Sequence, residues 1–374
     1  MVYLVGEIRI MSKNIKIILT GGGTAGHIWP TLAVQKAIEK KHKTEFLYIG
    51  SKNGLEAKIV PEQSIFYKSI SVGKLRRYFS WNNFIDPFRA MQGFFQASKI
   101  IKRFKPDIIF AKGGYVTAPV VLAAWIQSVP IILHESDSVM GMANKFLSKY
   151  ATKIAVTFPL QYYPKTIRNK AVYTGLPIRK EFLQDARCKI QDTNRRKTVL
   201  ITGGSQGAGA INHLIFSILP KLTEKYKVIH LTGEADFQRS QKLKNQLSKL
   251  QQTNYQNHSF VTKEMVGFLK SADLVVSRSG GAVFELAAMK KPAILIPLPS
   301  AASDHQNKNA EIFAQNHASL VLKESELTPN KLLANINDLI TKPVLLKRFS
   351  DNIYKMSMPN AADKIAELIL RQVK

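Results

Sequence analysis

Short apolar runs alternate with longer amphipathic stretches through the first half of the chain. The runs have the length of β-strands, and the stretches between most of them carry apolar residues at helical spacing. The predicted helices include Pro30–Lys40, Leu55–Val60 and Pro87–Phe104. The predicted strands are Lys16–Thr20, Phe46–Ile49, Phe66–Ser71, Ile108–Ala111, Pro130–His134, Ile154–Thr157 and Ala171–Thr174. Strands that alternate with helices in this way indicate βαβ units and a mostly parallel sheet.

The pattern restarts after a polar, charged stretch at 188–197. The predicted strands there are Val199–Thr202, Val228–Leu231, Ser259–Val261, Leu274–Ser277 and Ala293–Pro297. The predicted helices are Ile211–Leu222, Asp236–Leu250, Lys263–Lys270, Val283–Met289 and a helical stretch from Pro329 to Gln372. We expect one domain over 1–175, with 1–12 as an extension, and a second domain over 176–356. A terminal helix over 357–374 could pack back on the first domain.

Two glycine-rich loops, Gly21–His27 and Gly203–Gly209, each follow the first strand of one half. A strand, glycine loop and helix in this order bring backbone N–H groups and a helix N-terminus to an anionic group. Two such loops, each opening its own series of strands and helices, predict an α/β protein with two Rossmann-like domains that face each other across a cleft. The alternative is that both loops are only tight turns between a strand and a helix.

The first loop, Gly21-x-Gly23-x-x-Gly26, formally matches the dinucleotide-binding fingerprint. That fingerprint also requires an acidic residue about 20 residues further on, which binds the ribose. The second strand ends at Tyr48–Lys52 without a carboxylate, so a nicotinamide-dependent enzyme is disfavoured, although Lys52 leaves a phosphorylated dinucleotide open. The chain contains no GxxxxGK[ST] motif of the P-loop nucleoside triphosphatases.

His27 stands where the first glycine loop enters its helix. A neutral imidazole in a cleft could take the proton of an attacking hydroxyl group, and the helix N-terminus would keep its pKa low. The alternative is a histidine that only contacts phosphate or backbone. A third glycine loop, Lys112–Tyr115, and the polar run His134–Asp137 also follow apolar strands, at the sheet edge where α/β proteins bind ligands.

Two polar clusters follow strands of the second half. Ser277–Glu285 combines a strand end, a glycine turn and a helix start, so its amides suit a sugar or phosphate oxygen. Glu285 could accept hydrogen bonds from a ribose diol, with a capping or surface role as the alternative. Asp304–Asn307 suits sugar hydroxyls. The histidines, aspartates and glutamates do not have metal-ligand spacing, and we expect no metal and no cofactor.

The formal net charge is +28, which favours nucleic acid, an anionic membrane surface or phosphorylated substrates as partners, or reflects a compositional bias of the lineage. The single cysteine, Cys188, excludes an internal disulfide and a cysteine-cluster metal site, and it fits a reducing cytoplasm. The longest uncharged stretch, Gly113–Leu133, is interrupted by prolines and glycines. We therefore expect a loop, a buried helix and a buried strand there rather than a membrane span.

These loops, in this order, resemble the MurG family of peptidoglycan N-acetylglucosaminyltransferases. The resemblance covers nearly the whole chain after Met11, and the combination of motifs is far more specific than any single one. The matching segments are Gly21–His27, Gly113–Tyr115, His134–Asp137, Thr174–Arg179, Gly203–Ala208, Arg278–Glu285 and Asp304–Ala310. The segment 74–81 also resembles one branch of that family.

The resemblance implies a glycosyltransferase-B fold and an inverting transfer of GlcNAc from UDP-GlcNAc to undecaprenyl-pyrophosphoryl-MurNAc-pentapeptide. It implies that Ser205 and Arg179 contact the diphosphate and that the backbone near Val261 reads uracil. Glu285 would bind the ribose and Gln306 the GlcNAc hydroxyls. The remaining substrate contacts are expected at Thr24, Ala25, Gly26, Asp137, Gly281 and Ala282. His27 and Asp137 are the two candidate bases.

Three features depart from the family pattern. Ala25 stands where glycine is commoner, and Asp137 replaces a frequent asparagine. The stretch Arg278–Glu285 is one residue shorter than usual, which leaves the sugar and ribose contacts there open.

A lipid-linked acceptor requires the enzyme to reach a membrane. The segment Lys74–Lys105 interleaves basic residues with large apolar ones, which suits a peripheral position on an anionic surface; the alternative is that half of its aromatics are core. We expect the cytoplasmic face of the cell membrane as the location, and no nucleic acid as a partner. The open alternatives are a related transferase with another UDP-sugar or glycolipid acceptor, and a basic module that binds nucleic acid or membrane.

Overall fold

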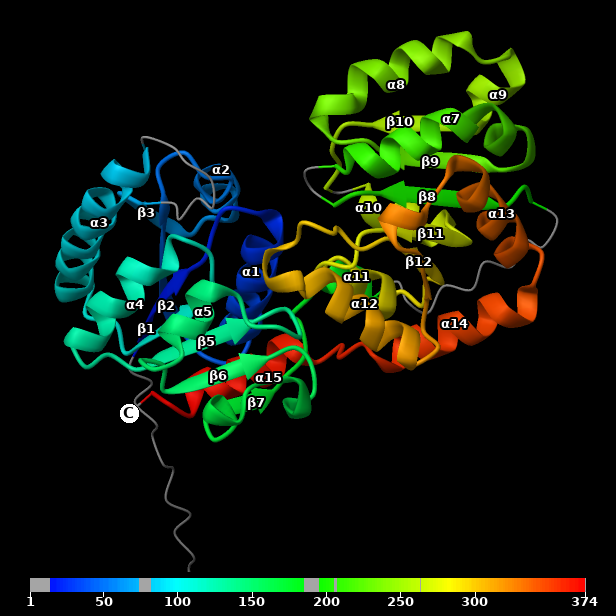
Figure 1. The fold of residues 1–374 in the computed structure, drawn as a ribbon. Coiled ribbons are helices and arrows are strands. Elements are labelled where there is room, and N and C mark those ends of the chain that lie inside the picture. The colour runs from blue at the N-terminus through cyan, green and yellow to red at the C-terminus, as the bar shows by residue number, and fades with distance from the viewer. Residues whose placement is uncertain (1–13, 74–81, 185–194, 205–206, 263, 374) are drawn as a thin grey trace, which may run out of the picture.

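The computed structural model describes residues 14–73, 82–184, 195–204, 207–262 and 264–373. The segment 74–81, Cys188 and Ser205 therefore lie outside the described residues. Two parallel sheets, each with helices on both faces, form the molecule (Figure 1). This confirms the predicted α/β class with two Rossmann-like units.

The first sheet has seven strands in the order β3-β2-β1-β4-β5-β6-β7. The strands are β1 (Ile15–Thr20), β2 (Thr44–Ser51), β3 (Phe66–Ile70), β4 (Ile108–Ala111), β5 (Ile131–Glu135), β6 (Lys153–Val156) and β7 (Ala171–Tyr173). The helices are α1 (Ala25–Glu39), α2 (Glu56–Ile59), α3 (Asn82–Phe104), α4 (Thr117–Ile126) and α5 (Met142–Leu147). All the strands predicted in this half are present.

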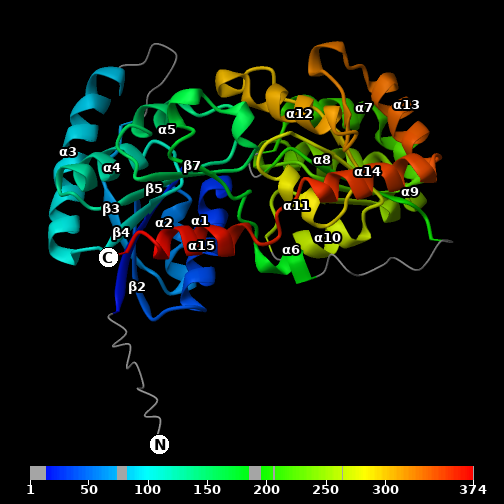
Figure 2. The same cartoon turned by 90° about the horizontal axis from the view of Figure 1, so that it is seen from below.

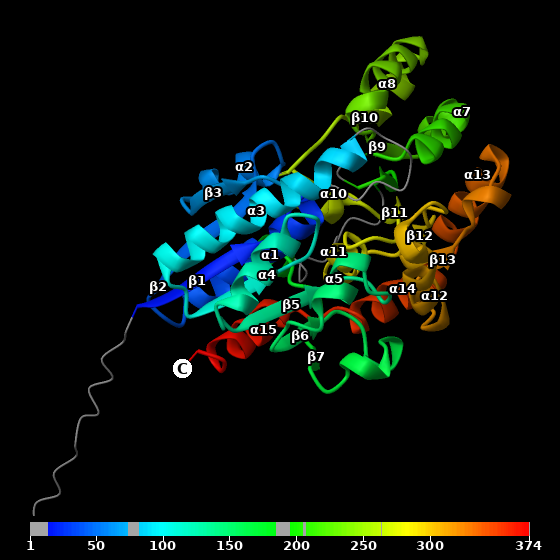
Figure 3. The same ribbon diagram turned by 60° about the vertical axis from the view of Figure 1, so that its left-hand side comes forward.

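Successive residues of β1 pack into two different cores, because side chains alternate between the faces of a strand. Ile18 joins the cluster under α3 and α4, whereas Ile17 and Leu19 join the cluster under α1. A strand buried on both faces has a continuous apolar sequence, as Ile17–Leu19 do, and Figure 3 shows helices on both faces of this sheet.

The second sheet has six strands in the order β10-β9-β8-β11-β12-β13. The strands are β8 (Thr198–Thr202), β9 (Lys227–Leu231), β10 (Tyr255–His258), β11 (Leu274–Ser277), β12 (Ala293–Leu295) and β13 (Leu320–Val321). The helices are α6 (Lys180–Gln184), α7 (Gly209–Lys225), α8 (Glu234–Gln246), α9 (Lys249–Asn254), α10 (Met265–Ser271), α11 (Val283–Ala288), α12 (His305–Gln315), α13 (Pro329–Ile340) and α14 (Pro343–Lys355).

The last helix, α15 (Ala361–Leu370), lies against α1 of the first domain rather than with the second sheet (Figure 2). Ile365, Ala366 and Ile369 are fully buried in the same cluster as Ile17 and Leu19 of β1. At the surface of this contact, Lys41 Nζ donates to Glu367 Oε1 at 2.8 Å.

Several predicted elements have different ends, for identifiable reasons. α1 begins at Ala25 and contains Pro30 in its interior, whereas the prediction began the helix at the proline because proline favours the first helical turn. The long helix predicted over Asp236–Leu250 is two helices, α8 and α9. Ser248 separates them: its Oγ accepts from Gln251 N and its own N donates to Gln251 Oε1, which is a capping box.

The strand predicted at Ser259–Val261 is wrong, because β10 occupies Tyr255–His258 and Val261 lies in the loop that follows. This strand is polar: Asn257 is buried and donates to Ser240 Oγ at 2.7 Å, so a hydrogen bond replaces the apolar contact that the pattern requires. The helical stretch predicted over Pro329–Gln372 is three separate helices, α13, α14 and α15. α5, α6, α12 and β13 were not predicted.

No helix within the described ranges is long and apolar enough to cross a membrane. The uncharged stretch Gly113–Leu133 forms the expected loop, the helix α4 and the start of β5.

Candidate functional site

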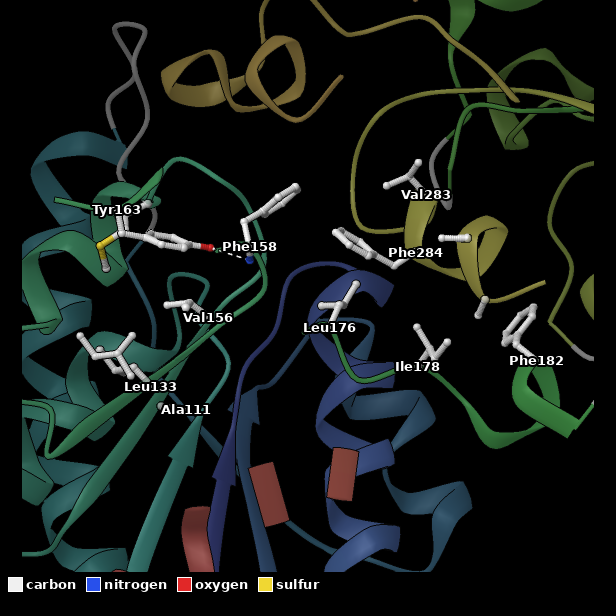
Figure 4. Packing of buried hydrophobic residues seen from close by; sticks show 14 of the residues in the cluster. Ala111, Leu133, Val156, Phe158, Tyr163, Leu176, Ile178, Phe182, Val283 and Phe284 are labelled. Atoms are coloured by element: carbon white, nitrogen blue, oxygen red, sulfur yellow. Dashed lines mark hydrogen bonds between the residues drawn. The ribbon is translucent and has the colours of Figure 1, made fainter. Parts of the chain in front are cut away.

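The two sheets meet through the loops that follow their strands, at the carboxyl edges where open α/β sheets bind ligands. Phe158, after β6, and Phe284, in α11, point toward each other with ring centroids 5.4 Å apart (Figure 4). Leu176 and Ile178 extend the same core through the connection between the domains. One apolar cluster contains residues of both domains. The loops at the carboxyl edges of the two sheets therefore face a common interface.

Two buried side chains, Tyr48 and Glu56, form hydrogen bonds with the backbone of the first glycine loop. Tyr48 Oη donates to Gly21 O at 2.5 Å, and Gly23 N donates to Glu56 Oε2 at 3.1 Å. The third glycine loop touches the first: a Cβ added to Gly114, whose φ is +90°, would lie 2.5 Å from Gly22 O. Only glycine permits both this backbone conformation and this approach.

His27 lies in the first turn of α1, and its Nδ1 is 3.0 Å from Thr24 Oγ1. If Nδ1–H donates to that hydroxyl oxygen, the lone pair is on Nε2, which is then the basic atom. Burial, and secondly the charge of Lys112, lower the pKa of His27 to about 3. The imidazole is therefore neutral at pH 7, as a base must be. Ala25 and Gly26 lie beside it at the open N-terminus of the helix.

Lys112 is a buried ammonium group between the ends of β1 and β5. Its Nζ donates to Ser136 Oγ, and the nearby charges of Glu135 and Asp137 favour its protonated form. Burial nevertheless lowers the pKa of Lys112 to about 8. Glu135 is structural, because its oxygens accept from Asp137 N, Gly141 N and Asn144 Nδ2.

Asp137 contacts the second domain directly. Its Oδ1 accepts a hydrogen bond from Asn309 Nδ2, in α12, at 2.9 Å. Its carbonyl oxygen accepts from Tyr163 Oη at 3.0 Å. His134 lies in β5 and is fully buried, with its Nε2 3.2 Å from Gly175 O. It therefore belongs to the core next to the site.

Arg179 joins the two domains and lies close to two other predicted site residues, Val261 and Glu285. Its guanidinium lies 4.9 Å from the ring centroid of Trp29 in α1 and 4.5 Å from that of Phe182. Nη1 donates to Thr262 O, next to Val261, at 3.1 Å, and Nη2 lies 3.8 Å from Glu285 Oε1. Burial raises the pKa of Glu285, and the charge of Arg179 opposes this shift. Arg179 Nε is buried and has no hydrogen-bond partner among the described residues.

The second glycine loop and α12 complete the site in the second domain. Gly204 has a φ of +86°, and a Cβ there would meet no atom of the described residues within 4 Å. Gln306 Oε1 accepts from Leu298 N at 3.0 Å, and a Cβ on Gly280 would be 4.0 Å from Gln306 Nε2. Gly281 and Ala282 form the turn that enters α11.

The predicted site residues therefore form three groups around the interface. Thr24–His27 follow β1 and Asp137 follows β5, two strands that β4 separates in the first sheet. Arg179, Val261 and Glu285 lie together, and Gln306 lies beside the 280–282 turn. Sequence reasoning assigned no role to Lys112, Trp29 or Asn309. Lys112 lies in a loop that was recognised by its glycines, and nothing in the sequence pattern indicated that its charged side chain is buried. Asn309 lies in a helix that was not predicted.

No group of three or more His, Cys, Asp or Glu that could hold a metal ion occurs in the part of the chain that the structure describes.

Two family models match the chain: the glycosyltransferase family 28 N-terminal domain over residues 17–156 and its C-terminal domain over residues 198–365. A Clostridium botulinum (strain Langeland) protein is 42% identical over 368 residues, which cover 96% of this chain and 99% of that protein. It is named UDP-N-acetylglucosamine--N-acetylmuramyl-(pentapeptide) pyrophosphoryl-undecaprenol N-acetylglucosamine transferase. The chain belongs to the MurG family.

Solved structures agree with this membership. The crystal structure of Acinetobacter baumannii MurG matches with a TM-score of 0.74 and 26% identity, over 96% of this MurG-family chain and 99% of that one. UDP-GlcNAc 2-epimerase from Neisseria meningitidis matches with a TM-score of 0.66 at 14% identity, over 96% and 100% of the two chains. At that identity the second match shows the fold alone. This chain is thus a glycosyltransferase with a glycosyltransferase-B fold.

Proposed function

We propose that this MurG-family enzyme transfers GlcNAc from UDP-GlcNAc to undecaprenyl-pyrophosphoryl-MurNAc-pentapeptide, with inversion at the anomeric carbon. The observation that carries this proposal is the 42% identity, over nearly the full length of both chains, with a protein named for this transfer. The convergence of the glycine loops, Arg179 and Glu285 on one interface supports it, because a nucleoside diphosphate needs amides, a cation and a diol acceptor together.

The donor lies on the second domain in this proposal. Amides of the 203–209 loop, Ser205 and the guanidinium of Arg179 bind the diphosphate, and the backbone near Val261 reads uracil. Glu285 accepts hydrogen bonds from the ribose diol, and Gln306 binds the sugar hydroxyls. The turn at Gly281 and Ala282 borders the sugar.

The reaction is one displacement. The acceptor hydroxyl oxygen bonds to C1 of GlcNAc, the bond from C1 to the diphosphate oxygen breaks, and UDP leaves with that electron pair. The hydroxyl proton goes to a base of the first domain, His27 or Asp137, near Thr24, Ala25 and Gly26. Arg179 and the loop amides stabilise the charge that develops on the departing diphosphate.

The first test is a ligand panel. UDP and UDP-GlcNAc should each raise the melting temperature, since a ligand that binds only the folded state stabilises it, while NAD and NADP should not. Transfer to a lipid-linked MurNAc-peptide should then be faster with UDP-GlcNAc than with UDP-GalNAc or UDP-glucose. Stabilisation by NAD without stabilisation by UDP would refute the proposal, and a preference for another UDP-sugar would favour the related-transferase alternative.

We further propose that α3 docks the enzyme on the cytoplasmic face of an anionic membrane. Ile85, Phe88, Met91 and Phe95 are 48%, 68%, 54% and 64% exposed, and their spacing places them along one side of the helix. The exposed residues Lys99 and Lys102 continue this side. Trp125 and Ile126 lie near it, because Gln127 Nε2 donates to Ser98 O at 3.2 Å. Exposed apolar side chains beside lysines suit anionic headgroups.

Vesicle sedimentation tests this surface. The enzyme should bind vesicles that contain phosphatidylglycerol, should bind phosphatidylcholine vesicles less, and should release at high salt. Phe88→Ser combined with Phe95→Ser should lower vesicle binding roughly tenfold or more, because two apolar side chains that would enter the bilayer are lost. Leu250→Ser, which removes a side chain 62% exposed on the second domain, is the matched control. Equal loss in both variants would disprove docking through α3.

A further inference from the structure

Asn309 connects the two domains through a side chain that is 1% exposed. Its Oδ1 accepts from Ser138 N at 3.0 Å and from Ser138 Oγ at 2.9 Å. Its Nδ2 donates to Asp137 Oδ1 at 2.9 Å and to Ser279 O at 3.1 Å. Asp137 and Ser138 belong to the first domain, whereas Ser279 and Asn309 belong to the second. We call Asp137, Ser138 and Asn309 the interdomain clasp.

The clasp uses the full hydrogen-bonding capacity of one amide. Its two donors and two acceptor positions are all occupied, and the neighbouring Ser138 and Ser279 are 3% and 0% exposed. Buried polar groups that lose such partners cost free energy unless water reaches them. We therefore expect the arrangement of the two domains to depend more on this buried amide than on an exposed contact between them.

The clasp is also tied to the residues predicted to bind the donor sugar. Ser279 Oγ donates to Gln306 O at 2.7 Å, while Ser279 O accepts from Asn309, one helical turn further along α12. Ser279 is followed directly by the 280–282 turn. A shift of this turn or of Gln306 when sugar binds would therefore be passed through α12 to Asn309 and so to Asp137.

A cavity of about 490 Å³ adjoins the clasp on the side of the first domain. Its lining includes Ser138, Met140, Lys145 and Tyr163, with Ser303 contributed by the second domain. Separation of the domains at Asn309 would withdraw Ser303 from this lining.

We propose that Asn309 is a positioning residue that closes the acceptor-side loop at Asp137 and Ser138 onto the donor-binding helix α12. The inference rests on the proposed function, in which the two substrates lie on opposite domains. Transfer requires them to be aligned within a fraction of an ångström, and a displacement of about 1 Å can cost on the order of a hundredfold in rate. Asn309 acts through the position of Asp137 rather than on the reacting atoms.

An exchange of the two side chains tests this proposal. Asn309→Asp keeps the size of the side chain but removes both donors and sets a carboxylate against Asp137. The double variant Asp137→Asn with Asn309→Asp restores a donor–acceptor pair with the roles reversed. Asn316→Asp is the matched control, because Asn316 lies at the end of α12 and its Nδ2 donates to Ile312 O within the second domain.

The main readout is the interdomain distance, which does not depend on turnover. Spin labels on cysteines placed at the exposed residues Glu62 and Lys242, in a Cys188→Ser background, report one residue on each domain. Asn309→Asp should shift the distance distribution away from that of the unchanged clasp, and the double variant should restore it. The milder Ser138→Ala should shift it in the same direction by less. Asn316→Asp should leave it in place.

Kinetics supply the second readout. Asn309→Asp should lower kcat about a hundredfold while the Kd for UDP stays within about threefold, since UDP binds the second domain alone. The double variant should recover at least about fivefold of that loss, as expected for two residues in direct contact. An unchanged distance distribution in Asn309→Asp, or one that the double variant fails to restore, overturns the inference. If the wild-type enzyme fails to use UDP-GlcNAc, the proposed function fails and the distance result still decides the clasp.

Discussion

Replacing His27 with alanine should lower kcat by at least about a hundredfold and leave the affinity for UDP-GlcNAc nearly unchanged, because a general base acts in the transition state only. The acceptor hydroxyl has to lose its proton as it bonds to GlcNAc. A pKa of about 3 in the free enzyme keeps the imidazole unprotonated across the physiological range. The kcat/KM profile between pH 5 and 8 should therefore show no acidic limb from His27 in the free enzyme.

So low a pKa makes His27 a weak base before substrates bind. The diphosphates of donor and acceptor bring negative charge to the interface, and nearby negative charge raises the pKa of an imidazole. The base thus gains strength when both substrates are present. Steady-state transfer rates, with UDP-GlcNAc binding measured by calorimetry, check the prediction.

Asp137→Asn is the comparison that decides between the two candidate bases. Asp137 already accepts from Asn309 through Oδ1, and its loop is fixed by Glu135 and Tyr163, which is the environment of a positioning group. We expect the loss of kcat in Asp137→Asn to be smaller than in His27→Ala. Near-normal kcat in His27→Ala would show that the histidine has a structural role, and the general base would then be Asp137 or water.

Replacing Glu285 with alanine should raise the KM for UDP-GlcNAc about tenfold to a hundredfold, with a smaller effect on kcat. A hydrogen bond to a charged group contributes about 1.5–3 kcal/mol, and a ribose contact is present in both the ground state and the transition state. Loss of the carboxylate also leaves Arg179 with its bond to Thr262 O and its ring contacts, so the guanidinium keeps its place. Initial rates over a range of UDP-GlcNAc concentrations measure both constants.

Glu324→Ala is the matched control for Glu285. Glu324 pairs with Arg278 at 2.6 Å, and that arginine also donates to Ile296 O and Pro297 O. Removing this second Arg–Glu pair should change stability but not the KM for the donor. If Glu285→Ala lowers kcat alone, the residue is closer to the reacting bond than we propose.

The sequence predicts the architecture well because parallel strands that are buried on both faces are continuous apolar runs. Such runs identify β1, β4 and β5 as strands. It fails where a hydrogen bond replaces apolar packing, as in the polar strand β10 with its buried Asn257. It also fails at helix ends: Pro30 suggested a start, while the true N-terminus at Ala25 is set by the glycine loop before it.

For the candidate site too, the sequence predicts local features and misses contacts between distant residues. Glycine loops can be recognised locally, so the groups around His27 and Glu285 were predictable as separate clusters. The contacts between the clusters were not, because Asn309 and Asp137 are 172 positions apart and meet only when both domains are in place. The charge of Lys112 was equally hidden, since its burial between two strand ends is a property of the sheet order rather than of neighbouring residues.

The position of α15 sets an order of events during protein synthesis. Residues 361–370 complete the core beneath α1, yet the ribosome makes them only after every strand of the second sheet. Until then the first domain presents an uncovered apolar surface around Ile28 and Leu32. A chain that folds from its N-terminus therefore cannot complete this core of the first domain until the second domain has been synthesised.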